Sequence, residues 1–97
     1  MIVSFKDEGT RDIFESRDTR HARRTCPSTL WRAARLKLEV LDRADSLVDL
    51  AIPQGNRLEG LQGNRAGQHS IRINRQYRIC FWWIEAGPDR VEIVDYH

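Results

Sequence analysis

Five arginines in the middle of the chain form a segment of one-sided charge. Between residues 55 and 83 they face a single carboxylate, Glu59, whereas the whole chain has a formal net charge of only +2. The five are Arg57, Arg65, Arg72, Arg75 and Arg78. A guanidinium presents a rigid fork of donors that matches phosphate oxygens and stacks on nucleobases. The segment therefore predicts an anion-binding surface, with a solvated basic face as the alternative.

The last three residues, Asp95, Tyr96 and His97, include groups that can move protons. An imidazole is the side chain best suited to acid–base work near neutral pH. A phenol can contribute a proton or stack on a base. The alternative for a terminal histidine is a frayed end without function.

Arginines combined with a histidine and a tyrosine suit the cleavage of RNA. The ribose 2′-hydroxyl serves as an internal nucleophile, so we expect neither a metal nor a cofactor. The protein must deprotonate that hydroxyl, stabilise charge on the phosphorane and protonate the leaving 5′-oxygen. Other chemistries are weakly supported, because the sequence has no Gly-rich phosphate loop and no nucleophile elbow. The histidines and cysteines also lack metal-ligand spacing.

Helical signals dominate the first half of the chain. Residues 1–5 predict a first strand, and Asp7 can cap a short helix within residues 7–17. The polar, basic stretch at residues 17–25 is predicted as a loop, and the order of residues 17–24 stays open. A second helix should begin near residues 26–28, with Pro27 in its first turn. Its apolar stripe is Leu30, Trp31, Ala34, Leu38 and Leu41. A short further turn is predicted near residues 46–50, opened by Asp45.

The period then changes to two, which predicts strands in the second half of the chain. One strand could start near Leu58, and the next follows at residues 69–73. A tight connection at residues 74–76 leads to the strongest strand, residues 77–84. A turn at residues 85–89 precedes a last strand at residues 90–96. We therefore predict an α+β fold, in which an N-terminal strand and two to three helices pack on one face of a small, mostly antiparallel C-terminal sheet.

Strand register predicts a row of polar side chains on one sheet face. If Ile73 pairs with Tyr77, Arg72 lies opposite Arg78. If Trp83 pairs with Val91, Arg78 lies near Tyr96. The opposite face would form the core with Ile71, Ile73, Ile79, Phe81, Trp83, Val91 and Ile93. Two facing arginines destabilise a sheet, and a bound phosphate could compensate. The alternative is that both side chains splay into water, and a bulge in either hairpin would move Arg78.

Length and composition indicate one ordinary globular domain spanning residues 1–97. The chain is 40% hydrophobic and 31% charged, which is typical of soluble proteins. Cys26 and Cys80 form no CxxC pair and are predicted to be reduced structural thiols. There is no signal-peptide pattern and no apolar run of the roughly 18–20 residues that a membrane span needs, so we expect a cytoplasmic protein without membrane contact.

Four motifs in the second half resemble the HigB-type toxins of the RelE-like superfamily of type II toxin–antitoxin systems. They are Gly55-Asn-Arg-Leu-Glu-Gly-Leu61, Gly63-Asn-Arg-Ala-Gly-Gln-His-Ser-Ile-Arg-Ile73, Tyr77-Arg-Ile-Cys-Phe81 and Val91-Glu-Ile-Val-Asp-Tyr-His97. The resemblance covers nearly the whole chain, because the opening residues and the helical first half fit as well. It implies a RelE-like microbial RNase fold and a ribosome-dependent mRNA endonuclease that inhibits translation. It also implies a helix-turn-helix antitoxin as partner, with operator DNA bound only through the antitoxin complex.

The resemblance assigns roles to individual residues. Arg65 and Arg78 match family arginines that contact phosphate and stabilise the transition state. Asp95, Tyr96 and His97 match the functional C-terminal segment. Arg57, Arg72 and Arg75 are candidate RNA contacts because of the one-sided charge of their segment, not because of the resemblance. The chain departs from some relatives at Glu59 and Gln62, where those relatives carry a histidine and a lysine. A weakly catalytic or non-catalytic toxin that binds ribosomes or RNA therefore stays open as the alternative.

Overall fold

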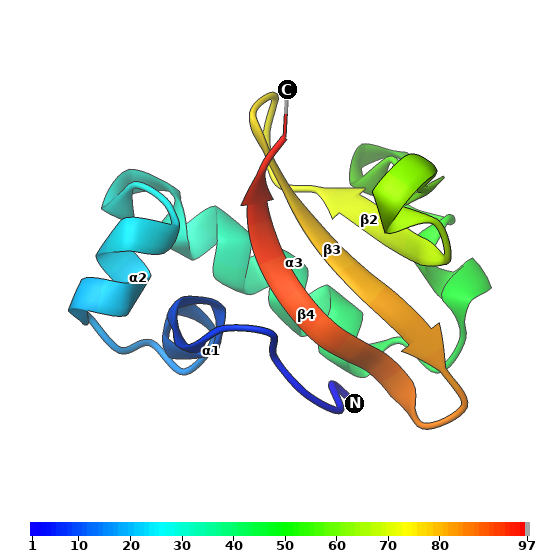
Figure 1. Ribbon diagram of the computed structural model, residues 1–97, viewed down its shortest axis with the longest axis horizontal. Coiled ribbons are helices and arrows are strands. Elements are labelled where there is room, and N and C mark those ends of the chain that lie inside the picture. Colours follow the sequence, from blue (N-terminus) through cyan, green and yellow to red (C-terminus); the bar gives the residue numbers. More distant parts are fainter. Residues whose placement is uncertain (97) are drawn as a thin grey trace.

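The structure, a computed structural model that describes residues 1–96, has helices in the first half of the chain and strands in the second. The α-helices are α1 (Glu8–Phe14), α2 (Arg20–Thr25) and α3 (Trp31–Arg43). The strands are β1 (Glu59–Gly60), β2 (Gln68–Arg72), β3 (Tyr77–Ile84) and β4 (Gly87–Asp95), which form one antiparallel sheet in the order β1-β2-β3-β4 (Figure 1). The predicted α+β class is confirmed.

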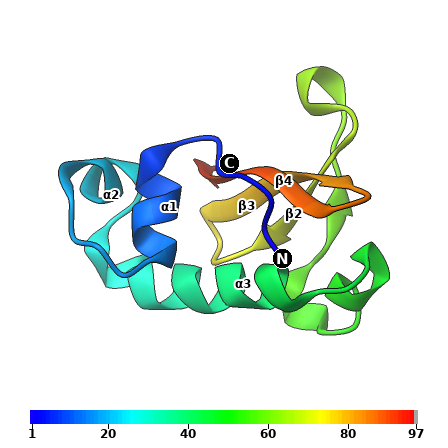
Figure 2. The same ribbon diagram turned by 90° about the horizontal axis from the view of Figure 1, so that it is seen from below.

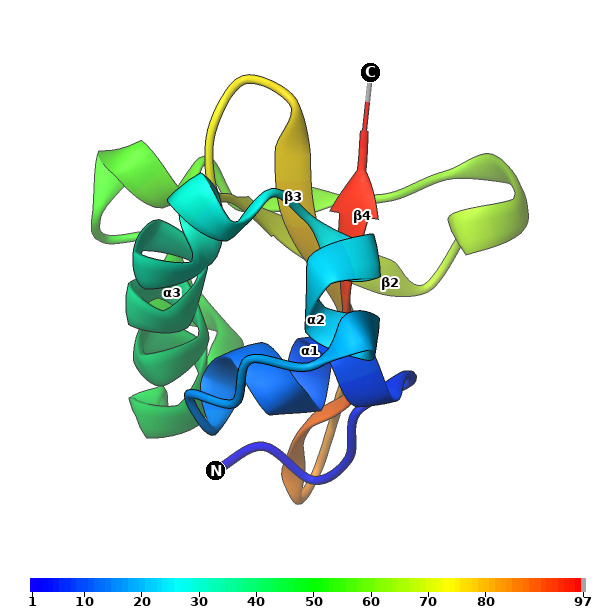
Figure 3. The ribbon, with the colours of Figure 1, turned by 90° about the vertical axis from the view of Figure 1, so that its left-hand side faces the viewer.

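The segment that was predicted as a loop at residues 17–25 contains helix α2, so that prediction is wrong. The Thr19 hydroxyl caps the helix by accepting from the Ala22 N–H at 3.1 Å, and it donates to Asp12 at 2.6 Å. Ala22 is fully buried, whereas the other side chains of α2 are exposed or half-buried. Helices α1 and α2 pack side by side at one end of the molecule (Figure 3). One buried alanine among charged residues gives no apolar periodicity in the sequence, so the helix could not be predicted from pattern. Its formation depends on tertiary packing instead.

Helix α3 is amphipathic and buries one face under the sheet. Ala34, Leu38 and Leu41 are all fully buried, at the four- and three-residue spacing of one helix face. The helix begins at Trp31 after a 3-10 turn, Ser28–Leu30, so the start predicted near residues 26–28 is about one turn too early. The predicted further turn is confirmed as a 3-10 turn at Leu47–Leu50, although its cap is Ser46 rather than Asp45.

The N-terminal residues do not form the predicted strand. They run beside β4 and make one isolated parallel bridge, between Phe5 and Val91. The Ile2 N–H donates to Asp42 Oδ1 at 2.8 Å, and the Ser4 hydroxyl donates to Asp89 at 2.6 Å. Main-chain hydrogen bonds join the segment to β4 at Pro88 and Val91: the Val3 N–H donates to the Pro88 carbonyl at 2.7 Å, and Val91 bonds Ser4 at 3.0 Å and Lys6 at 2.9 Å. These bonds do not extend into a continuous ladder.

The β2–β3 hairpin has the predicted register, with Arg72 opposite Arg78. The β3–β4 hairpin does not, because Arg78 lies opposite Val94 and Trp83 opposite Pro88. Its turn comprises only two residues between Ile84 and Gly87, and a bulge follows between Cys80 and Trp82. Near Arg78 the register differs from the prediction by two positions. Since side chains alternate between faces, Tyr96 still belongs to the face that carries Arg78.

The predicted core face is confirmed, and it lies against α3. Figure 2 shows α3 along one side of the sheet, while the segment between β1 and β2 extends away from the other side. The buried strand residues are Ile71, Ile79, Phe81, Val91 and Ile93, with Ile73 and Trp83 partly buried against them. We call the opposite side the open face. Within residues 1–96, no helix is long and apolar enough to cross a membrane.

Candidate functional site

A pocket of about 370 Å³ lies on the open face, and arginines dominate its wall. Its lining residues are Arg57, Glu59, Arg72, Asn74, Arg75, Arg78 and Tyr96. Four of the five arginines predicted as an anion-binding surface therefore meet around one cavity, together with the predicted tyrosine. Four cations against one carboxylate favour an anionic ligand.

Arg78 is the most constrained of these arginines. Only 10% of its side chain is exposed, and Nε donates to Ser70 Oγ at 2.7 Å. Nη2 donates to the carbonyl oxygens of Arg57 at 2.5 Å and Ser70 at 3.4 Å. The remaining nitrogen, Nη1, lies 4.0 Å from Glu59 Oε1, beyond hydrogen-bond distance. The guanidinium is thus held on two of its three nitrogens, which fixes the direction of the third.

The carbonyl of Arg57 is aimed at Arg78 by a strained turn. Arg57 has φ 45° and ψ 55°, in the left-handed region that few non-glycine residues adopt. The preceding Asn56 is 1% exposed; it accepts from Lys37 Nζ at 2.6 Å and donates to the Leu50 carbonyl at 3.2 Å. These contacts hold the turn in place and oppose relaxation of the backbone.

Arg72 is the last residue of β2, and Arg75 lies in the turn between β2 and β3. Arg72 Nε donates to the Asn74 carbonyl at 3.0 Å, which turns it toward a different acceptor from those of Arg78. The Asn74 side chain accepts from the N–H groups of Gln76 at 2.9 Å and Tyr77 at 2.7 Å, as an Asx turn does. Separate acceptors let the two facing arginines share one face without a bound anion. Arg75 is exposed at the turn.

The C-terminal segment reaches the pocket through Tyr96. Its N–H donates to the Gln76 carbonyl at 2.6 Å, and 37% of the residue is exposed. Asp95 lies opposite Tyr77 and accepts from Gln76 Nε2 at 3.1 Å, so strand alternation places it on the other face from Arg78. His97 lies outside the described residues, and its predicted role stays a prediction.

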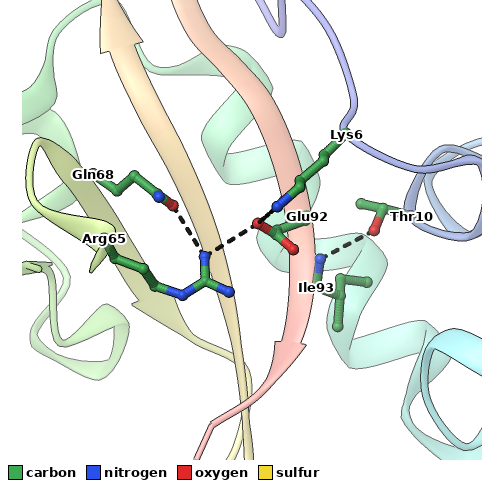
Figure 4. A network of polar contacts seen from close by, with 6 residues as sticks. All are labelled: Lys6, Thr10, Arg65, Gln68, Glu92 and Ile93. Atoms are coloured by element: carbon green, nitrogen blue, oxygen red, sulfur yellow. Dashed lines mark hydrogen bonds and ion pairs between the residues drawn. The ribbon is translucent and has the colours of Figure 1, made fainter. Parts of the chain in front are cut away.

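Arg65 lies on the open face but does not line the pocket. Its Nη1 donates to Gln68 Oε1 and to Glu92 Oε2, each at 3.1 Å, and Lys6 Nζ donates to the same Glu92 oxygen at 3.2 Å (Figure 4). Burial acts to lower the pKa of Arg65, but the hydrogen bond and charge of Glu92 outweigh it and raise that pKa. Glu92 therefore ties the β1–β2 segment to β4.

Sequence reasoning missed three residues of this site. Ser70 is two residues before Arg72, and Glu92 is four residues before Tyr96. An even spacing along a strand puts both on the predicted open face, so the strand pattern could have located them. Glu59 was noted as the single carboxylate of the basic segment and as a departure from relatives, but not as a site residue. Its pairing with Ser70 brings it to the pocket, and β1 is too short for a periodic signal.

Comparisons with known proteins show the family to which the chain belongs. Residues 3–97 match the sequence profile described as the RelE-like toxin of type II toxin–antitoxin system HigB. The chain is 46% identical to Toxin HigB-1 of Vibrio cholerae, over 88% of this chain and 86% of that protein. It is 31% identical to an uncharacterized protein of Haemophilus influenzae, over 79% of this chain and 73% of that protein. The chain belongs to the HigB family of RelE-like toxins of type II toxin–antitoxin systems.

Proposed function

We propose that this toxin is an endoribonuclease that cuts mRNA on the ribosome without a metal ion. The observation that carries the proposal is the fixed guanidinium of Arg78, which presents Nη1 to a pocket lined by three further arginines and Tyr96. A donor held before the reaction stabilises developing charge without reorganising, and removing one such donor typically slows catalysis by about 10²–10³-fold.

In this proposal the scissile phosphate lies at Nη1 of Arg78. Arg57, Arg72 and Arg75 hold the flanking phosphates, because they line the same pocket and are less constrained than Arg78. Attack by the 2′-hydroxyl produces a 2′,3′-cyclic phosphate and a free 5′-hydroxyl. Tyr96 and His97 protonate the leaving oxygen or position the RNA, whereas Asp95 lies on the other face of the sheet and takes no part in the chemistry.

Arg65 takes a second place on the RNA in this proposal. Its hydrogen bonds to Gln68 and Glu92 both use Nη1, and its side chain is 29% exposed. Its open-face position lets it contact a phosphate beyond the pocket while Glu92 keeps hold of Nη1. We assign it to backbone contact rather than to the scissile phosphate.

A type II toxin has an antitoxin partner. Because the chain belongs to such a family, it has an antitoxin partner too. We propose in addition that the antitoxin has a helix-turn-helix domain and that operator DNA is bound only through the joint complex. The ribosomal A site supplies the mRNA. The described residues carry their surplus arginines on a sheet face, which suits an exposed RNA strand.

Transcript ends mapped in cells that lack the antitoxin test the proposal. Wild type and Arg32→Ala, an exposed control on α3, should both produce cuts in phase with codons. Arg78→Ala, and a chain without Tyr96 and His97, should produce none. Growth arrest by wild type with intact transcripts would contradict cleavage and favour a toxin that only binds ribosomes or RNA.

A further inference from the structure

An arginine and a tryptophan are stacked on the open face, outside the pocket that the proposed function uses. The Arg90 guanidinium lies over the ring of Trp82, with 4.5 Å between Cζ and the ring centroid. Trp82 alternates with Cys80 and Arg78 along β3, so its ring belongs to the open face. Four residues of strand put Trp82 roughly 13 Å from Arg78 along the sheet.

The main chain adopts a strained conformation at Arg90. At the bulge between Cys80 and Trp82, β4 has one residue more than β3, and Arg90 lies in this bulge. Arg90 has φ 50°, in the left-handed region that favours glycine. Among residues 1–96 only two other non-glycine residues have a positive φ, and one of them is Arg57 at the pocket. An arginine kept in this conformation points to a function of its side chain.

Neighbouring groups hold both members of the pair in place. The Ser4 hydroxyl accepts from the Arg90 N–H at 3.0 Å and donates to Asp89 Oδ1 at 2.6 Å. Asp89 Oδ2 lies 3.4 Å from Arg90 Nε, which directs the guanidinium. Gly67 lies so close to the Trp82 ring that an added Cβ would be 2.6 Å from it. The pair is therefore preorganised, while the Arg90 side chain is still 55% exposed.

We propose that Trp82 and Arg90 form a stacking site for one nucleobase of the mRNA strand whose phosphates occupy the pocket. The assignment rests on the proposed endoribonuclease function. A guanidinium plane stacks on aromatic side chains and on nucleobases alike. One side of the Arg90 guanidinium lies on the indole, and a base stacks on its exposed side. Stacking of this kind accepts any base, because every base has a π-face.

Arg65 lies between the pocket and the stacking site. It donates to Gln68, which is opposite Trp82 on β2. It also donates to Glu92, which is opposite Cys80, the outward residue of β3 between Trp82 and the pocket (Figure 4). The phosphate that the proposed function assigns to Arg65 therefore falls on the path of a strand that joins the two sites.

Two carboxylates near this path are paired within the protein. Asp89 pairs with Arg90, and Glu92 pairs with both Lys6 and Arg65. Three cations against two carboxylates leave a positive surplus, so the phosphates of a strand that crosses here meet cations rather than unpaired acids.

The competing role for Arg90 is that of a cover that keeps water from the Trp82 ring. A cover affects folding, and no particular base of the RNA depends on it. A stacking site needs a base at one position of the RNA and a planar cation beneath it. Arg90→Lys keeps the charge and removes the plane, whereas Arg90→Asn removes both but still accepts the left-handed backbone.

Abasic nucleotides in a non-cleavable mRNA separate the two roles. The probe is ribosome-bound mRNA with 2′-O-methyl riboses, which lack the nucleophilic hydroxyl, and one base at a time is removed. We expect one position within about four nucleotides of the cut at which removal weakens binding of the wild-type toxin by about 5–100-fold. Intact RNA should bind Arg90→Lys and Arg90→Asn more weakly, and removal of that base should change their binding little.

The matched control is Arg32→Lys, on α3 at the other side of the sheet, which should show the full base effect of wild type. Melting temperatures report whether each variant is folded. Equal binding of wild type to every abasic RNA overturns the stacking site, and this arm needs no variant. A base effect of equal size in wild type and folded Arg90→Asn overturns it as well.

The same measurements distinguish failure of the stacking site from failure of the proposed function. Wild type that cuts unmethylated mRNA on the ribosome but shows no base effect refutes the stacking site alone. Wild type that shows the base effect, with its loss in Arg90→Asn, but cuts no unmethylated mRNA refutes cleavage and supports the stacking site.

Discussion

Removing the Ser70 hydroxyl should destabilise the protein, because Arg78 Nε then loses its partner in a nearly closed environment. Ser70 is fully buried, and the hydrogen bond measures 2.7 Å. A hydrogen bond to a charged group contributes about 1.5–3 kcal/mol. We therefore expect Ser70→Ala to lower the free energy of unfolding by about 2 kcal/mol, which corresponds to a melting temperature roughly 8–16 °C lower in a domain of this size.

Urea denaturation measures this loss, and a double-mutant cycle assigns it to the pair. Ser70→Ala, Arg78→Met and the double variant should show a coupling energy of about 2 kcal/mol. Ser28→Ala, at an exposed serine that begins the 3-10 turn before α3, is the control and should change stability by under about 0.5 kcal/mol. Additive losses in the cycle, or a Ser70→Ala cost as small as that of the control, would refute the view that this hydroxyl holds Arg78.

Three further predictions concern the parts around the pocket. Gly67→Ala should cost more than about 1 kcal/mol in urea unfolding, since Gly67 has φ +94° and an added Cβ would lie 2.6 Å from the Trp82 ring; Gly55→Ala, with nothing within 4 Å, should not. Glu92→Gln should speed hydrogen exchange of the Gly63–Arg65 amides and leave β3 amides protected, whereas equal protection would count against the Arg65 tether. Burial raises the pKa of Cys26 from 9.0 to about 11. The unfolded thiol therefore ionises at a lower pH than the folded one, so the Cys26 contribution to the free energy of unfolding should be fully present below pH 9 and decline as pH rises from 9 through 11. Burial also raises the pKa values of Cys80 and Tyr77, so Cys26→Ala should lose only part of that decline. Urea midpoints of wild type and variant across this range measure the Cys26 contribution, and an equal decline in both would refute it.

Local sequence rules predicted the parts of the site that neighbouring residues determine. The Asn74–Gln76 connection fixes which residues of β2 and β3 face each other, because Asn74 satisfies the turn amides within three residues. The opposition of Arg72 and Arg78 follows directly from that turn. The core face could be predicted from the alternation of side chains along each strand, which is also a local property.

The remaining parts depend on contacts between distant residues. The two-residue turn between Ile84 and Gly87 sets the β3–β4 register three positions from the prediction. The bulge between Cys80 and Trp82, which has no signal in a strand rich in aromatics, reduces the difference to two positions near Arg78. The carbonyl that holds Arg78 comes from a residue 21 positions away, and no side-chain pattern marks a main-chain acceptor. Helix α2 depends on Thr19 bonding to Asp12 of α1, which makes its stability a tertiary property.

The support that Arg57 gives to Arg78 comes from a backbone oxygen, whereas its own side chain lines the pocket. Any residue that accepts the left-handed turn, such as asparagine or glycine, would present the same oxygen. Substitutions at residue 57 can therefore change the charge and size of its side chain while the main-chain hydrogen bond to Arg78 is kept. Residue 57 thus has two separate functions: its main-chain oxygen holds Arg78, and its side chain contributes to ligand preference. The second can change in evolution without altering the first.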